Sequence, residues 1–304
     1  MNQNYYTPVY FVNNEEKLET NSNYIRGFQI YQSLARLHKN THWVNIQKLL
    51  AILKNTREQR TIIYTCKPSI KTIDTIRKHS NIYIIYDIID DARNGMKKVI
   101  NITQKSDIII VPNSDMLKIL NTKYPNKVCY TEFHNWDSKF ASFTRTIPLN
   151  KPIFSMSGHL NEFEKLILTK LKDKIVYLGI CPLEKELQSV NIALCFRNDE
   201  EMFVKPTTKL SASASFQTIY AGTGNYTFKE MLGSNYPYLI SNENIDINRV
   251  KKFLTYIEST YNTDVWFEAQ KIMKEVLHKT SVDSITKRLY DVLDKHLCLQ
   301  SEEL

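Results

Sequence analysis

One pattern repeats along most of this chain: a short apolar run, a polar link and then an amphipathic segment. The apolar runs, such as IYIIYD and DIIIVP, are nearly continuous, which is typical of parallel strands covered on both faces. Strands that alternate with helices predict a doubly wound α/β fold. In the first half we expect strands at 8–12, 61–65, 82–87, 107–112 and 127–131, and helices at 24–38, 43–53, 70–78, 93–104 and 114–122.

The pattern is interrupted by SKFASFTRTIPLNKP at residues 138–152, an irregular segment with two prolines that indicates a linker. Beyond it, Asn161 followed by Glu164 three residues later is a capping-box signature for a helix start. Residues 244–297 indicate helices that break near Asn262 and Thr280. The strands expected after the linker are 152–156, 174–178, 190–195, 218–221 and 238–240.

This organisation predicts two doubly wound α/β domains, at residues 1–145 and 146–284, followed by a last helix at 285–304. A chain of 304 residues with 42% hydrophobic residues is long enough to bury two such cores. Doubly wound sheets bind ligands at the carboxyl ends of their strands. Functional residues are therefore expected directly after the predicted strands.

Composition limits the kinds of partner. The formal net charge of +8 favours anionic ligands such as nucleotides and sugar phosphates. Five scattered cysteines without a CxxC pair predict neither a disulfide framework nor a zinc site. The polar N-terminus lacks a signal-peptide pattern, and no apolar run approaches the roughly 20 residues of a membrane span. We expect a soluble, cytoplasmic protein, with peripheral membrane contact left open.

The stretch FVKPTTKLSASASF places Lys205 and Lys209 at the start of a predicted helix, where cations do not complement the helix dipole. The N–H groups of a first helical turn bind anions. Arg197 follows the preceding predicted strand and can converge on the same point. These residues predict a diphosphate site, and the alternative is a solvated basic turn before a buried Ala/Ser helix.

Acidic residues follow the predicted strand at 82–87 in IYIIYDIIDD, which supplies Asp87, Asp90 and Asp91. Carboxylates at that edge can bind a metal, orient a hydroxyl acceptor or act as a base. The alternative is that Asp90 or Asp91 caps the following helix. In FHNWD, His134 follows the last strand of the first domain and is a candidate general base, with a structural role as the alternative.

Two further segments carry polar candidates. In AGTGNYTFKEMLG, a loop with Gly222 and Gly224 precedes Glu230, which can accept hydrogen bonds from a sugar or ribose hydroxyl or remain a solvated charge. In SNYIRGFQ, Arg26 can reach a phosphate, although helix packing at Gly27 is the simpler interpretation. None of the patterns GxxxxGK[ST], GxGxxG, GxSxG or HExxH occurs.

Four stretches together resemble a GT-B glycosyltransferase of the family-four-like nucleotide-sugar superfamily. They are NSNYIRGFQIYQSLARL, SDIIIVPNSDMLKIL, FHNWD, and VKPTTKLSASASFQTIYAGTG followed by KEMLGSNYPYL. The resemblance spans about residues 8–240. It implies two Rossmann-like domains, transfer from a nucleotide-diphosphate sugar to a hydroxyl on a glycan or other glycoconjugate, and no essential metal. Nucleic acid is not an expected partner.

The resemblance also implies roles for particular residues. It implies that the helix at 285–297 crosses back to the first domain. The diphosphate contacts would be Arg197, Lys205, Lys209 and Gly158; the sugar or ribose contacts Glu230, Ser211 and Gly224; and the residues near the acceptor His134, Asp87 and Asp91.

This chain departs from the family at a pair of glutamates found across the donor site of many relatives. Aligning the Ser/Ala helix places Ser211 at the later glutamate and Phe203 near the earlier one. Aligning Pro237 keeps Glu230 as the later glutamate and places Gly222 at the earlier position. In either alignment at least one carboxylate is absent, and LETNSN replaces the glycine-rich loop near residue 20.

Three alternatives stay open at the level of sequence. IIDD as a metal-binding acidic motif would indicate a GT-A glycosyltransferase that needs Mn²⁺ or Mg²⁺. A nucleotide-sugar epimerase of similar two-domain fold would need no acceptor. A non-catalytic protein would bind glycans or nucleic acid on its basic face, with a steep salt dependence.

Overall fold

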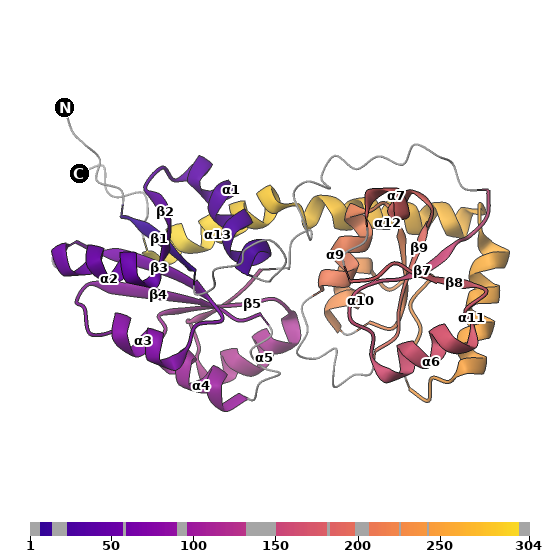
Figure 1. Cartoon of the computed structure of the whole chain (residues 1–304), viewed down its shortest axis with the longest axis horizontal. Helices are drawn as coiled ribbons and strands as arrows, with labels where there is room; N and C mark the ends of the chain where they lie inside the picture. Colours follow the sequence, from indigo (N-terminus) through magenta and orange to yellow (C-terminus); the bar gives the residue numbers. More distant parts are fainter. Residues whose placement is uncertain are drawn as a thin grey trace. The chain divides into compact units, whose positions relative to one another are not determined.

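The computed structural model describes residues 7–13, 23–56, 59–89, 96–131, 150–180, 183–197, 207–224, 226–241 and 243–297. These residues form two compact units (Figure 1). The first unit contains the described residues up to 131 together with those from 281 onward, and the second contains the described residues from 150 to 280. Both units have parallel sheets with intervening helices, which confirms the predicted pair of doubly wound α/β folds.

The first unit has a six-stranded parallel sheet in the order β2-β1-β3-β4-β5-β6. Its central strands at 61–66, 82–87 and 108–111 are buried on both faces, as their composition predicts. The strands are β1 (Val9–Asn13), β2 (Thr41–Asn45), β3 (Thr61–Cys66), β4 (Ile82–Asp87), β5 (Ile108–Val111) and β6 (Val128–Tyr130).

Two layers of helices cover the two faces of this sheet. One core contains side chains of π-helical η1 (Asn23–Gln29), α1 (Ile30–Leu37) and α13 (Val282–Leu297), together with Phe11 and Tyr64 of the sheet. The other core contains side chains of α2 (Ile46–Asn55), α3 (Ile70–Ile76), α4 (Met96–Gln104) and α5 (Ser114–Lys123). The last helix of the chain therefore belongs to the first unit, where Ile285, Leu289 and Leu293 are buried.

The predicted helix at 43–53 is wrong at its start. Residues Thr41–Asn45 form edge strand β2 beside β1, and α2 begins only at Ile46. Asn45 ends the strand and caps the helix by accepting the backbone N–H of Lys48 at 2.8 Å. The strand THWVN has only five residues and leads directly into the amphipathic helix α2, so the sequence shows no separate strand pattern there.

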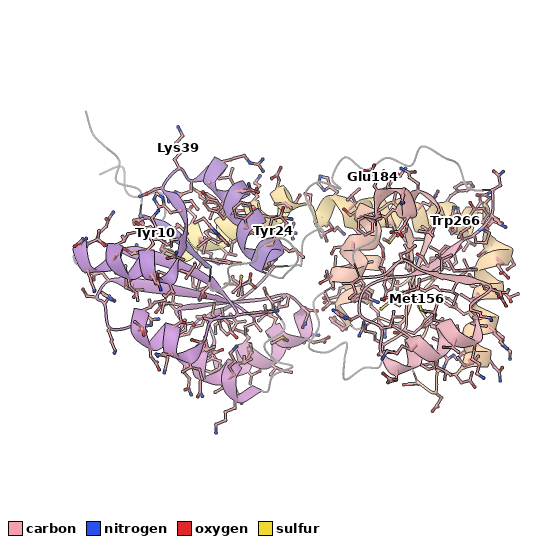
Figure 2. All side chains as sticks on the ribbon, viewed as in Figure 1. Tyr10, Tyr24, Lys39, Met156, Glu184 and Trp266 are labelled. Atoms are coloured by element: carbon pink, nitrogen blue, oxygen red, sulfur yellow. The ribbon has the colours of Figure 1, made fainter. Side chains whose placement is uncertain are left out.

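The second unit has a four-stranded parallel sheet in the order β10-β9-β7-β8. Its elements are β7 (Phe154–Met156), α6 (Glu162–Lys170), β8 (Ile175–Tyr177), α7 (Glu184–Gln188), β9 (Ile192–Cys195), α9 (Thr208–Ser215), β10 (Ile219–Gly222), α10 (Tyr226–Leu232), α11 (Ile247–Thr260) and α12 (Asp264–Lys279). The expected strand at 238–240 is reduced to one isolated bridge between Leu239 and Gly222. Figure 2 shows the side chains that fill the unit, including buried Met156 of β7.

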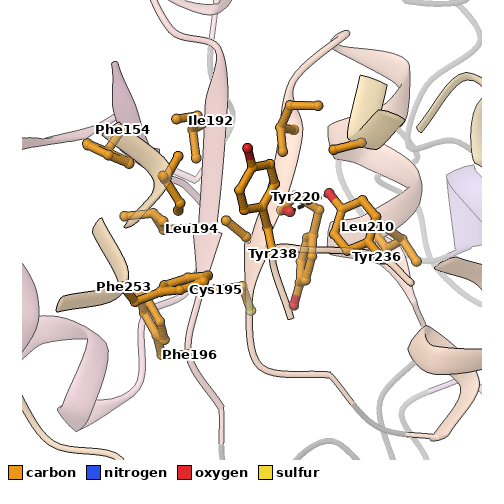
Figure 3. Close-up of a cluster of buried hydrophobic side chains, with 14 of the residues drawn as sticks. Phe154, Ile192, Leu194, Cys195, Phe196, Leu210, Tyr220, Tyr236, Tyr238 and Phe253 are labelled. Carbon is orange, nitrogen blue, oxygen red and sulfur yellow. Dashed lines mark hydrogen bonds between the residues drawn. The ribbon is translucent and has the colours of Figure 1, made fainter. Parts of the chain in front are cut away.

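Close packing in the second unit depends on aromatic side chains beside the sheet (Figure 3). Tyr236 donates a hydrogen bond to the carbonyl oxygen of Tyr220 at 2.6 Å, which ties the segment after α10 to β10. Tyr220 in turn donates to the carbonyl oxygen of Thr223 at 2.6 Å. These buried hydroxyl groups are satisfied by backbone acceptors, and they hold the loop that follows β10.

Candidate functional site

The strand order of the second unit locates its ligand-binding edge. The chain runs from β7 to β8 on one side of β7, and then crosses to β9 and β10 on the other side. The order therefore reverses between β7 and β9. Ligands of open α/β sheets bind outside the carboxyl ends of the strands at such a switch point. The loops at this place contain Gly158 after β7 and Arg197 after β9.

A buried carboxylate lies at the centre of this edge. Asn161 and Glu164 form the predicted capping box of α6, in which Glu164 Oε2 accepts the backbone N–H of Asn161 at 3.1 Å. Glu164 Oε1 also accepts the backbone N–H of Phe196 at 3.1 Å. The Glu164 side chain is 0% exposed. The capping box thus connects the start of α6 to the residue that follows β9.

Two cations face the two oxygens of Glu164. Nη2 of Arg197 lies 3.5 Å from Oε2, and Nζ of Lys209 lies 3.5 Å from Oε1. Arg197 is 8% exposed, and its Nη2 also donates to the carbonyl oxygen of His159 at 2.6 Å. Arg197 and Lys209 therefore converge on one carboxylate, and their contact with a diphosphate stays a prediction.

Lys209 differs from an ordinary surface lysine. Its Nζ is buried and makes no hydrogen bond to any described residue. The Oγ1 of Thr207, at the N-cap of α9, is likewise buried and without a hydrogen-bond partner in the described parts of the chain. Buried polar groups that lack partners cost free energy. An anionic ligand at the start of α9 would supply acceptors to both groups.

Gly158 lies beside Lys209. A Cβ atom at Gly158 would lie 3.9 Å from Cε of Lys209, an ordinary contact, whereas its φ of +78° is a backbone conformation that favours glycine. Its N–H donates to the carbonyl oxygen of Gly179 at 2.7 Å, and its carbonyl oxygen accepts from Tyr177 at 3.0 Å. Gly158 therefore contributes turn geometry to this edge, while its N–H is already used within the protein.

The three predicted sugar or ribose contacts differ in burial and in the contacts that they make. Ser211 is fully buried within α9, and its hydroxyl donates to the carbonyl oxygen of Thr208 at 3.1 Å. A Cβ atom at Gly224 would lie 2.7 Å from Cβ of Phe228, so this glycine is required by the packing of the loop on α10. Glu230 is exposed on α10. A role for these residues in sugar binding stays a prediction.

In the first unit, Asp87 is turned into the protein. Its carboxylate is 0% exposed, accepts from Nε of Arg26 at 2.6 Å and also accepts from the hydroxyl of Tyr64. Burial raises the pKa of the Asp87 carboxyl, and the charge of Arg26 opposes this shift. The expectation of an open carboxylate at the strand end is not met, because Asp87 is the partner of a buried arginine.

Arg26 is 1% exposed, so it is not placed to reach a phosphate. Besides Asp87, its Nη2 donates to the hydroxyl of Thr131. The three residues come from η1, β4 and the position after β6. Arg26 therefore connects three segments of the first unit, which corrects the interpretation of this arginine as a candidate ligand contact.

The predicted site residues His134, Asp91 and Lys205 lie outside the described residues, as does the neighbouring candidate Asp90. Glu164 was recognised from the sequence only as a capping residue. The signal that could have found it is its spacing: it lies eight residues after the end of β7, on the first turn of the helix behind the switch point.

Within the described part of the chain, no three His, Cys, Asp or Glu side chains gather where they could hold a metal ion. No described helix is long and apolar enough to cross a membrane.

Comparison with known proteins gives a match in structure but not in sequence. No protein-family model matches the sequence, and no curated protein matches it. A glycosyltransferase from Rickettsia africae superposes with a TM-score of 0.64 at 11% identity, covering 96% of this chain and 99% of that one. HepE from Anabaena has a TM-score of 0.63 at 10% identity, covering 95% and 100% of the two chains.

BGT of phage T4 also superposes, with a TM-score of 0.56 at 11% identity, and the match covers 95% of this chain and 99% of that one. Identity this low establishes the fold, and the fold of this chain is GT-B. The GT-A alternative is therefore wrong at the level of fold, because both units are parallel doubly wound sheets of the GT-B kind.

Proposed function

We propose that this protein transfers a glycosyl group from a nucleotide-diphosphate sugar to a hydroxyl acceptor on a glycan or other glycoconjugate. The observation that carries this proposal is the convergence of Arg197 and Lys209 at the switch point of the second sheet. Two cations at one point suit a diphosphate better than they suit a neutral ligand. The GT-B fold supports the same reading, since its solved examples include glycosyltransferases.

The chemistry of the proposed reaction requires charge stabilisation on the leaving group. Glycosyl transfer passes through an oxocarbenium-like transition state, and negative charge develops on the departing diphosphate. Arg197 and Lys209, with the helix N-terminus of α9, would stabilise that charge in place. Because the buried Nζ of Lys209 has no hydrogen-bond acceptor among the described residues, a phosphate oxygen would provide one.

Solved neighbours suggest which donor to test first. HepE and the BGT of phage T4 were solved with UDP, the latter also with Mn²⁺, and the pneumococcal O-GlcNAc transferase GtfA was solved with UDP and GlcNAc. We therefore propose a UDP-sugar as the donor. Whether the sugar is a hexose or a pentose is to be settled by comparing donors.

We further propose that the reaction needs no essential metal, because Arg197 and Lys209 would take the place of a metal at the diphosphate. Transfer that continues in EDTA is the expected result. Loss of transfer in EDTA with recovery on adding Mn²⁺ would contradict this proposal.

The remaining candidate residues keep their sequence-based roles as proposals. Lys205 would join the diphosphate contacts, and His134 and Asp91 would act near the acceptor, with His134 as the general base. Replacement of His134 by Ala should lower turnover more than it lowers donor affinity. An unchanged rate would leave His134 with a structural role.

The experiment that tests the proposed function is a thermal-shift screen of the full chain with UDP, GDP, ADP, CMP and dTDP. A ligand that binds only the folded state stabilises it by about 2.7 kcal/mol at a concentration of about 100 Kd. We expect UDP to raise the melting temperature and uridine to have little effect. If none of the five nucleotides stabilises the protein, the proposed function is wrong.

A further inference from the structure

Glu164 has more contacts than helix capping requires. A capping box needs the carboxylate to accept one backbone N–H, and Oε2 of Glu164 does this with Asn161. The other oxygen accepts from the backbone of Phe196, and each oxygen faces one cation. A fully buried carboxylate in contact with two separate cations therefore joins the helix start to the predicted diphosphate site.

The distances show what kind of contact this is. Both cation-to-oxygen distances are 3.5 Å, whereas a charge-assisted hydrogen bond between such groups is roughly 2.7–2.9 Å. Glu164 thus attracts Arg197 and Lys209 electrostatically without taking up the N–H donors of Lys209. The ammonium group of Lys209 is therefore held in position by Glu164 and can still donate hydrogen bonds to a ligand.

We propose that Glu164 is a positioning residue that holds Arg197 and Lys209 together for the phosphate-bearing part of the ligand. This inference rests on the proposed function and concerns the same site. Without the carboxylate, the two like charges repel, and the long side chain of Lys209 gains the rotamer freedom that burial removes. The ligand would then have to order Lys209 again, which lowers affinity for phosphates and leaves affinity for a nucleoside unchanged.

The test compares Glu164→Gln with Glu162→Gln. Glutamine keeps the size of the side chain, and its carbonyl oxygen can accept the N–H of Asn161 in the capping box of α6, whereas its amide nitrogen cannot accept the N–H of Phe196 as Oε1 of Glu164 does. Glu162 lies on the same helix, is 90% exposed and pairs with Lys165, so it is a matched control. Binding of UDP and inorganic pyrophosphate is measured by calorimetry, and binding of uridine by saturation-transfer NMR.

We expect Glu164→Gln to weaken UDP and pyrophosphate binding by about tenfold or more, which is the effect of losing one charge-assisted hydrogen bond between Lys209 and a phosphate oxygen. Uridine binding should stay within about twofold. Glu162→Gln should bind all three ligands as the unmodified protein does. Unchanged or tighter UDP binding by Glu164→Gln overturns the inference. An equal loss for uridine also overturns it, because a purely structural role of Glu164 lowers all binding alike.

A double-mutant cycle shows whether Glu164 acts through the lysine. In a Lys209→Met background, Glu164→Gln should cause a smaller further loss of UDP binding than it causes alone. Full additivity of the two losses contradicts the inference. If Glu164→Gln does not fold, Glu164→Asp keeps the charge and withdraws it by one methylene, and its UDP affinity should fall in the same direction. If the unmodified protein binds neither UDP nor pyrophosphate, it is the proposed function that fails.

Discussion

The hydroxyl of Thr223 makes two hydrogen bonds to the backbone of Arg197: it accepts the N–H at 2.7 Å and donates to the carbonyl oxygen at 2.8 Å. Thr223 follows β10, and Arg197 follows the neighbouring strand β9. The side chain of Thr223 thus continues the pairing of the two strands beyond their ends. The backbone of Arg197 is held from β10, while its guanidinium lies beside Glu164.

This relationship predicts different outcomes for two substitutions at Thr223. Thr223→Val has nearly the same shape but leaves a buried N–H and a buried carbonyl of Arg197 without these bonds, so the free energy of unfolding should fall by about 1–3 kcal/mol. Thr223→Ser keeps the hydroxyl and should lose less. Urea unfolding measures both, and a Val variant as stable as the Ser variant would contradict the role of these bonds.

Replacing Asp87 by Asn should destabilise the first unit strongly. The change leaves the charge of buried Arg26 without its carboxylate, which typically costs about 3–5 kcal/mol. Asp74→Asn is the control, because Asp74 pairs with Lys105 at the surface, where such pairs contribute about 0–1 kcal/mol. The measurement is the urea midpoint of each variant.

Asp87 is also a predicted residue near the acceptor, and the same variant separates the two roles. If Asp87→Asn unfolds at a lower urea concentration and the remaining folded protein turns over normally, Asp87 acts through the fold. A stable Asp87→Asn protein with no turnover would instead assign it to the reaction.

Lys209→Met should lower affinity for a nucleoside diphosphate by about tenfold or more, since a charge-assisted contact to phosphate is lost. The ligand-free protein should lose some stability, because Glu164 loses one of the two cations that face its buried carboxylate. Lys229→Met, at an exposed position of α10, is the matched control. Calorimetry with UDP and a thermal melt without ligand test both parts. Full UDP affinity in Lys209→Met would remove Lys209 from the site.

At alkaline pH the protein should unfold at a lower urea concentration than at neutral pH. Burial raises the pKa of Tyr64, Tyr220 and Tyr236 well above the usual value of about 10. The folded state therefore keeps protons that the unfolded chain releases. The stabilising effect is complete below about pH 10 and is lost as the pH rises further, by at most about 1.4 kcal/mol per pH unit for each group.

Tyr236→Phe removes one of the three titrating hydroxyl groups and should reduce the pH dependence of the unfolding free energy accordingly. The measurement is the change in urea midpoint between pH 9 and 11. Tyr226→Phe, at an exposed position, controls for the change of residue type. The Tyr236 variant should also be less stable at neutral pH, because its hydrogen bond to the carbonyl oxygen of Tyr220 is lost. An unchanged alkaline slope in Tyr236→Phe would show that other groups cause it.

Local patterns were sufficient for much of the fold. The strands at β3, β4 and β5 were predicted because each is a continuous apolar run bounded by polar residues. The helix start at Asn161 was predicted because a capping box depends on residues only three positions apart. Strand β2 was missed because an edge strand of five residues that leads directly into a helix has no separate pattern of its own.

The candidate site was predicted only in part. The sequence predicts that Arg197 follows a strand and that Lys209 lies at a helix start, because both positions depend only on the order of neighbouring elements. The burial of Asp87 was not visible, because it depends on Arg26, 61 positions away in the chain. A carboxylate after a strand looks the same in sequence whether it faces a ligand or a buried arginine.

The sequence by itself determined the two α/β units and the basic residues at the carboxyl edge of the second sheet, because hydrophobic periodicity and the order of elements are local properties. Only the tertiary structure decided that Glu164 lies between Arg197 and Lys209, and that Thr223 holds the backbone of Arg197. Both depend on side chains that meet where separate strands and helices end together. These long-range contacts depend on strand order and packing, and no single segment of the chain specifies either of them.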